Sequence, residues 1–171
     1  MSRALAISLI LSALLGGIVI GAFIHMPPQQ ALVGVATRTV VIDDAKTVVG
    51  INDYRATKGL PALQTSEQLH SSACAKVADM IAKNYWDHND PEGREPWHFI
   101  IDTGYTYKNA GENQAYGFLN ESGIVNGWIN SPEHEKVMSG EYTSVGVCSK
   151  QGNFQGGYNW VTVAHFATEA N

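Results

Sequence analysis

The chain has 171 residues, a formal net charge of −5 and two cysteines. This length is sufficient for one ordinary domain and an accessory segment. The sequence has no basic block, so nucleic acid is excluded as the expected partner, and acidity this mild indicates no other partner.

The N-terminus carries a long apolar segment. Residues 4–24 are uncharged and mostly apolar, and they follow Arg3. A helix that crosses a bilayer needs about 20 such residues, so the segment is long enough to span. A secretory signal has a shorter apolar core and a small-x-small cleavage site close behind it. Here the nearest such pattern is Gly34-Val35-Ala36, well downstream.

These features divide the chain into three parts. We predict a membrane anchor or signal segment at 1–24, a tether at 25–42 and one domain at 43–168. The domain is expected outside the cytoplasm, held at the membrane through residues 4–24 as a transmembrane helix. The alternative is a protein that is secreted after signal cleavage.

The domain shows helical patterns first. Asp43 and Asp44 can cap a helix that runs to Lys58, before Gly59 stops it. A second helix, 66–84, has a single apolar stripe, and the pair Thr65 and Gln68 forms a capping box for it. Further helices are predicted at 96–103, at 122–130, and from Ser131 onward with Pro132 in the first position.

Strand patterns are fewer and concentrate near the C-terminus. We predict strands at 112–118, 142–149 and 158–167, and the last is the richest in β-forming residues. The glycine-containing loop 150–157 would join the last two strands as a hairpin. Helices interleaved with an antiparallel sheet indicate a layered arrangement of helices and strands.

Two cysteines, Cys74 and Cys148, fit an oxidising compartment. An even count in an exported domain suggests one disulfide, which here would join a helix to a strand across 73 intervening residues. A disulfide that closes a long loop lowers the entropy of the unfolded chain most and so stabilises the folded state most. The alternative is two buried free thiols.

Three loops, 86–93, 110–113 and 130–135, concentrate polar residues. Histidines and carboxylates on separate loops of a rigid scaffold are how metal and acid–base sites are usually built. His88 and His134 with Glu112 would form a His2Glu set that leaves one position on zinc for water or substrate. The same three residues could transfer protons without a metal.

A structural interpretation of these loops is equally open. Glu112 could accept hydrogen bonds from loop amides, and His88 could tie loops together beside Trp86. His165, in the last predicted strand, is expected to line the core or the cleft. The sequence contains no serine nucleophile elbow and no phosphate-binding glycine loop.

The motifs, taken in order, resemble those of one known family. They are Ile51-Asn52-Asp53-Tyr54-Arg55, Trp86-Asp87-His88, Gly111-Glu112-Asn113, Ser131-Pro132-Glu133-His134 and Val163-Ala164-His165-Phe166. This order is similar to that of a bacterial CAP domain (SCP-like; cysteine-rich secretory protein, antigen 5 and pathogenesis-related 1). The resemblance implies an α+β fold, a three-layer α-β-α sandwich around a small, mainly antiparallel sheet.

The resemblance also implies a cleft of histidines and glutamates that in some members binds zinc or another divalent ion. His88 and Glu112 match the first histidine and the Gly-Glu-Asn glutamate of that set, and His134 matches the Ser-Pro-x-His histidine of the bacterial branch. Ser131 stands where eukaryotic members have a second glutamate, and Glu141 stands in place of their second histidine. Residues expected at the edge of the cleft are Ser131, Glu141 and His165.

Members of this family have been linked to lipid or sterol binding, to surface interactions and, in scattered cases, to proteolysis. We therefore predict a binding module for a small ligand, a peptide, a lipid or envelope component, or a divalent metal, rather than an enzyme. One alternative is a metal-assisted hydrolase of envelope peptides or glycans with Glu112 as general base. Another is a structural or adhesive envelope protein without a ligand.

Overall fold

A computed structural model of the chain describes residues 40–170, so the predicted anchor and the tether up to residue 39 lie outside the described residues. Within 40–170, no helix is both long and apolar enough to cross a membrane. The elements, in chain order, are α1 (Asp44–Thr57), β1 (Gln64–Thr65), α2 (Glu67–Lys83), α3 (Trp97–Ile101), β2 (Tyr107–Tyr116), α4 (Glu121–Ile129), α5 (Pro132–Met138), β3 (Ser144–Phe154) and β4 (Gly157–Glu169).

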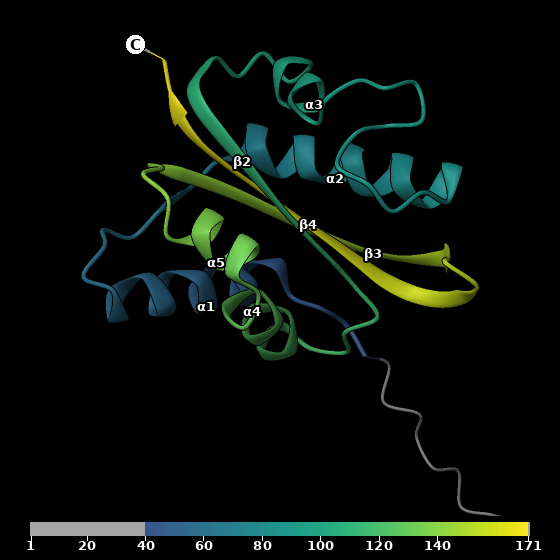
Figure 1. Cartoon of the computed structure of the whole chain (residues 1–171), viewed down its shortest axis with the longest axis horizontal. Coiled ribbons are helices and arrows are strands. Elements are labelled where there is room, and N and C mark those ends of the chain that lie inside the picture. The colour runs from purple at the N-terminus through teal and green to yellow at the C-terminus, as the bar shows by residue number, and fades with distance from the viewer. Residues whose placement is uncertain (1–39, 171) are drawn as a thin grey trace, which may run out of the picture. The chain divides into compact units, whose positions relative to one another are not determined.

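The four strands form one sheet in the order β1-β3-β4-β2. The pairs β3–β4 and β2–β4 are antiparallel, and only the two-residue β1 runs parallel to its neighbour β3. Helices α2 and α3 cover one face of the sheet, and α1, α4 and α5 cover the other (Figure 1). The described part of the chain is therefore a mixed fold of helices around a mainly antiparallel sheet, as the sequence predicted.

The prediction of a loop at 150–157 is wrong, because β3 and β4 continue through most of this segment. The turn consists only of Gln155 and Gly156, which have φ angles of 49° and 79°. A two-residue turn with positive φ at both central positions matches the natural twist of a hairpin. Most of the glycine-containing segment therefore stays in the ladder, and Phe154 pairs with Gly157.

The predicted cap of α2 is also wrong. Ser66 caps this helix, since its hydroxyl accepts a hydrogen bond from the Leu69 amide at 3.3 Å. Thr65 instead belongs to β1, where it pairs with Val145 of β3. In contrast, the cap of α1 is as predicted, because the Asp43 carboxylate accepts the first free amides of that helix.

Two boundaries differ because tertiary pairing outweighs local pattern. β2 begins at Tyr107, five residues before the predicted start, and pairs with β4 along its whole length. Its first half is polar and carries little β signal, so the pairing with β4 decides its conformation. Helix α3 is shorter than the predicted 96–103 and ends at Ile101.

Helix α2 lies directly on the sheet. Its apolar stripe, formed by Leu69, Ala73, Val77 and Met80, is fully buried. At Gly146 of β3 the approach is so close that a Cβ atom would overlap the backbone nitrogen of His70. A glycine at this position therefore allows the helix to reach the sheet.

A disulfide joins these two layers. Cys74 of α2 is bonded to Cys148 of β3, as predicted, and the alternative of two free thiols is wrong. The bond links residues 74 positions apart in the sequence. It therefore restricts the unfolded chain strongly and favours the folded state.

Candidate functional site

Glu112 and His165 lie buried at the bottom of the site. Glu112 lies on β2 directly opposite His165 on β4, and residues in such a cross-strand pair share one face of the sheet. Glu112 Oε2 is 2.9 Å from His165 Nε2. On its other side His165 Nδ1 is 2.6 Å from the hydroxyl of Ser72 on α2. A continuous polar chain thus runs from α2 through both strands.

The second carboxylate oxygen of Glu112 continues this chain to the surface. Glu112 Oε1 is 2.6 Å from His88 Nδ1 and accepts a hydrogen bond from Gln114 Nε2 at 2.8 Å. The Glu112 side chain is 1% exposed, whereas that of His88 is 57% exposed. Glu112 therefore holds His88 from below and does not itself face solvent.

The charge of this pair follows from its hydrogen bonds. Burial raises the pKa of Glu112, but the hydrogen bonds from His165 and His88 outweigh burial and set the pKa at about 2. The hydrogen bond to Glu112 raises the pKa of His88 above that of a free imidazole, against the opposing effect of burial. Glu112 is thus ionised at neutral pH, and its carboxylate holds the proton of the His88 imidazole on Nδ1.

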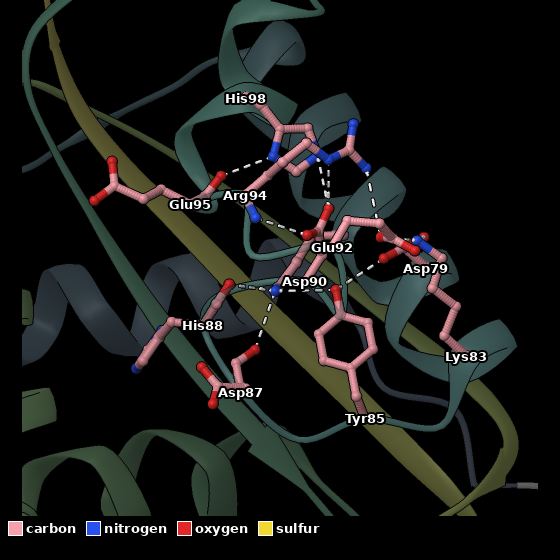
Figure 2. A network of polar contacts seen from close by, with 11 residues as sticks. Asp79, Lys83, Tyr85, Asp87, His88, Asp90, Glu92, Arg94, Glu95 and His98 are labelled. Atoms are coloured by element: carbon pink, nitrogen blue, oxygen red, sulfur yellow. Dashed lines mark hydrogen bonds and ion pairs between the residues drawn. The ribbon is translucent and has the colours of Figure 1, made fainter.

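Lys76 of α2 fixes the loop that carries His88. Its side chain is fully buried, and its ammonium group donates to the Tyr85 hydroxyl at 3.1 Å and to the carbonyls of Asp87 at 3.0 Å and His88 at 2.5 Å. Figure 2 shows Tyr85, Asp87 and His88 with their polar contacts, and the His88 ring extends away from this network. Burial lowers the pKa of Lys76, and the nearby Glu112 carboxylate opposes this effect.

The rest of this loop is held by ion pairs. The buried Asp90 carboxylate accepts hydrogen bonds from the Arg94 amide at 2.8 Å and from Arg94 Nε at 2.7 Å. Glu92 pairs with Lys83 of α2 at 2.7 Å (Figure 2). The segment before α3 is therefore anchored on both sides of His88, which restricts the positions that the imidazole can take.

His134 enters the site from the opposite layer. It lies on α5, and its Nδ1 is 2.7 Å from the Ser131 hydroxyl. Ser131 occupies the N-cap position but makes no side-chain capping bond, because its hydroxyl is engaged by His134. Asn113 of β2 donates to the His134 carbonyl at 2.9 Å and ties α5 to the sheet. Burial lowers the pKa of His134, and the charge of His88 lowers it further.

The two histidines share one open pocket. It has a volume of about 330 Å³ and is lined by Trp86, Asp87, His88, Gln114 and His134. Each imidazole uses Nδ1 for an internal contact. Within residues 40–170 no hydrogen bond engages the Nε2 atom of either ring. Both histidines therefore line the pocket with one ring nitrogen held and the other without a hydrogen-bond partner in this part of the chain.

The structure brings together some of the predicted residues and not others. His88, Glu112 and His165 are in direct contact, and His134 lines the same pocket with Ser131 behind it. The three-donor His2Glu geometry is not formed. In the described part of the chain, one group of three His, Cys, Asp or Glu residues has its donor atoms within 4.8 Å of one another, and that group lies elsewhere.

Glu141 does not lie in the pocket. It is exposed in the turn before β3, and its backbone carbonyl accepts hydrogen bonds from Asn109 and Thr168 at 2.8 and 3.1 Å. Its role is to close the end of the sheet through the main chain. Glu141 is not among the residues that line the pocket, and its place in the cleft stays a prediction from the motif order.

Three further residues of the site, Ser72, Lys76 and Gln114, were missed by sequence analysis. Lys76 carried a signal, because it lies three residues after Ala73 and four before Met80, within the apolar stripe of α2. A charged residue in such a stripe is seldom buried unless it has partners. Gln114 shares the face of Glu112 by strand alternation. Nothing local marks Ser72.

Lys76→Met should lower the free energy of unfolding by about 2 kcal/mol, because three acceptors lose the charged donor that satisfies them. Amide hydrogen exchange at residues 85–90 should become faster in the same variant. Urea unfolding and exchange measured by mass spectrometry would check both. The control is Lys83→Met, which removes two partly exposed ion pairs, with Asp79 and Glu92, from the same helix and should change stability much less. Equal losses in both variants would contradict the role of Lys76.

The sequence matches a known protein family. The family model described as “CAP: Cysteine-rich secretory protein family” matches residues 49–166. The Bacillus subtilis (strain 168) protein YkwD is 38% identical over 113 residues, which are 66% of this chain and 44% of YkwD. The chain thus spans less than half the length of that relative.

Two solved structures share the fold. An outer surface protein from Borrelia burgdorferi superposes with a TM-score of 0.67 and 19% identity, covering 74% of this chain and 93% of that one. An extracellular protein containing an SCP domain from Bacillus anthracis str. Ames gives a TM-score of 0.62 and 24% identity, covering 73% of this chain and 40% of that one. At these identities the likeness shows the fold alone.

Proposed function

The chain belongs to the cysteine-rich secretory protein (CAP) family, and from this membership we propose that it is an extracytoplasmic binding module. Its site is the pocket between His88 and His134. Its ligand is a divalent metal such as zinc, or a small polar molecule or peptide group that two imidazoles can hold. Glu112 supports the site from beneath.

One observation carries this proposal: both imidazoles are held through Nδ1 and leave Nε2 free at a common pocket. A histidine that binds a metal usually donates its other ring nitrogen to a carboxylate or another oxygen, which sets its tautomer and orientation. Glu112 supplies this contact for His88, and Ser131 supplies it for His134. The pocket is thus built as two oriented donors with room for water or ligand groups.

The location outside the cytoplasm has independent support. The disulfide between Cys74 and Cys148 is typical of an oxidising compartment. The two structural neighbours are named as an outer surface protein and an extracellular protein. Attachment to the membrane through residues 4–24 stays a prediction, with secretion after cleavage as its alternative.

The geometry favours binding over hydrolysis. A general base works best when its pKa lies near the pH of the reaction. The pKa of Glu112 is about 2, and both of its oxygens accept hydrogen bonds from neighbouring side chains. Glu112 is therefore a weak base with no free position for a substrate proton, which counts against a metal-assisted hydrolase that depends on it.

Calorimetric titration of the oxidised full-length chain with Zn²⁺ and Co²⁺ tests the proposal. We expect binding by the wild type and at least about tenfold weaker binding by His88→Ala and His134→Ala, since each removes one of two donors. Bound metal should also raise the stability by about 2.7 kcal/mol at a free concentration of 100 Kd. His98→Ala is the matched control, because this histidine lies on α3 outside the pocket and touches the His88 loop only through a 3.8 Å contact with Asp90.

Two results would contradict the binding module. One is the absence of binding to metals and to a panel of peptides and lipids by folded wild-type protein. The other is a His88→Ala variant with a lower Tm but unchanged ligand affinity. That second result would favour the structural alternative, in which the polar residues serve only the fold.

A further inference from the structure

The disulfide has an imidazole beside it. His70 and Cys74 lie four residues apart on one face of α2, and Cys148 comes from β3 beneath. His70 Nε2 is 3.6 Å from Cys74 Sγ. These are the three residues, within 40–170, whose donor atoms all lie within 4.8 Å of one another. The cluster lies on α2 and β3 and shares no residue with the His88 pocket.

The tautomer of His70 is set by the main chain. Its Nδ1 is 2.6 Å from the carbonyl oxygen of Val147. A carbonyl oxygen only accepts hydrogen bonds, so Nδ1 carries the proton. In the neutral ring Nε2 then has a free lone pair on the side of the sulfur. A backbone carbonyl orients metal-binding histidines in the same way.

The spacing of one donor pair, His70 Nε2 and Cys74 Sγ, suits a tetrahedral ion, and the two sulfurs must separate when their bond is reduced. With zinc bonds of about 2.05 Å to nitrogen and 2.3 Å to sulfur, tetrahedral angles place the two donors about 3.6 Å apart. The His70 Nε2 to Cys74 Sγ distance is 3.6 Å. One imidazole and two thiolates are also the donors that zinc prefers, and such a set leaves a fourth position for water.

An ion could enter this site from solvent. Cys74 is partly exposed, whereas Cys148 is 2% exposed. His70 also lines an open pocket of about 480 Å³, together with Asp44 and Glu67. Among residues 40–170, Asp44 Oδ1 is buried without a hydrogen-bond partner, so the same pocket contains an unsatisfied acceptor. Two carboxylates that line the same pocket as His70 favour a cation over an anion there.

We propose that His70, Cys74 and Cys148 form a zinc-type cation site when the disulfide is reduced. A dithiol reductant supplies two electrons and two protons to the sulfur–sulfur bond, becomes a disulfide itself and leaves two thiols. The cation then binds both sulfurs as thiolates, two protons are released, and His70 Nε2 donates its lone pair. The disulfide and the cation site are mutually exclusive states of the same residues, and the second is available before the disulfide forms.

Cobalt titration of the full-length chain, reduced with a water-soluble phosphine, tests the proposal. Reduced wild type should bind one Co²⁺ through sulfur, in addition to any ion at the His88 pocket. That ion should give sulfur-to-metal charge-transfer absorbance in the near ultraviolet, and Zn²⁺ should remove the absorbance. Oxidised protein should show no such absorbance. His70→Ala should bind Co²⁺ at least about tenfold more weakly, since it removes one of three donors.

The double variant His88→Ala/His134→Ala separates this site from the proposed binding pocket, because it should leave the thiolate absorbance unchanged. Circular dichroism reports the fold in each sample. Folded, reduced protein without the absorbance would overturn the proposal, and so would equal affinities in wild type and His70→Ala. If reduction unfolds the chain, recovery of the native spectrum on addition of Zn²⁺ supports the site, and no recovery overturns it.

Discussion

Gly146→Ala should lower the free energy of unfolding by at least about 3 kcal/mol, the upper end of the usual cost of overpacking. The added methyl group would overlap backbone atoms of Leu69 and His70, which belong to a packed helix. A flexible side chain could move aside, but this part of α2 cannot move without separating from the sheet. Urea unfolding followed by circular dichroism would measure the loss.

The same variant should weaken ligand binding at the His88 pocket. Helix α2 carries Ser72 and Lys76, which hold His165 and the His88 loop respectively. A shift of the helix would therefore loosen both supports of the site. Gly146 lines a different pocket, so the substitution would act on the His88 pocket only through the shift of α2.

Gly50→Ala is the matched control for this prediction. A methyl group at Gly50 of α1 would meet only the side chain of Val125, at 3.1 Å. Alanine also gains about 1 kcal/mol of helix propensity over glycine, which offsets the tight contact. Equal stabilities of the Gly146→Ala and Gly50→Ala proteins would contradict the close approach of α2 to β3.

Glu112→Gln should cost about 3 kcal/mol of stability at neutral pH. The pKa of Glu112 falls from its ordinary value of 4.5 to about 2 in the folded chain. This difference of about 2.5 units, at 1.36 kcal/mol per unit, is worth about 3 kcal/mol. The variant keeps the shape of the side chain but removes the charge that His88 and His165 contact. Its ligand affinity should fall as well, because His88 loses the partner that orients it.

The stability that Glu112 contributes depends on pH in a direction set by its lowered pKa. Since the folded-state pKa of Glu112 is depressed, its contribution is fully present above about pH 4.5 and is lost as the pH falls towards 2. The stability difference between wild type and Glu112→Gln should therefore shrink across this range. Urea unfolding at a series of pH values would show it.

The control for the charge itself is Glu92→Gln. Glu92 lies in the same polar network but is 54% exposed, where its pairs with Lys83 and Arg94 are screened by water. Its substitution should change stability little at any pH. A Glu112→Gln difference that stays constant from pH 7 to pH 2 would show that the lost stability comes from packing and not from charge.

Part of the site could be predicted from the sequence. The pairing of His88 with Glu112 was expected from the motif order, and the structure places their side chains 2.6 Å apart. The donor atoms of His134 do not join those of His88 and Glu112 within 4.8 Å, and both oxygens of Glu112 bond to neighbouring side chains. Glu141 does not line the pocket, since a motif offset says nothing about the direction in which a turn leaves the sheet.

Local physical chemistry explains what the sequence determined by itself. Helix α1 begins at its acidic cap, α2 is defined by its apolar stripe, and the count of two cysteines indicated the bond between Cys74 and Cys148. Each of these signals depends on residues close in the chain or on composition. They were sufficient to predict the order of most elements and the mixed, mainly antiparallel fold.

Only the tertiary structure decided the chemistry of the site. His88 and His165 contact Glu112 from 24 and 53 positions away in the sequence, and the register of β2 against β4 brings the second pair together. The role of Lys76 as the anchor of the His88 loop arises in the same way. Hydrogen-bond partners, burial and the resulting pKa values depend on neighbours in space, so no spacing along the chain could specify them.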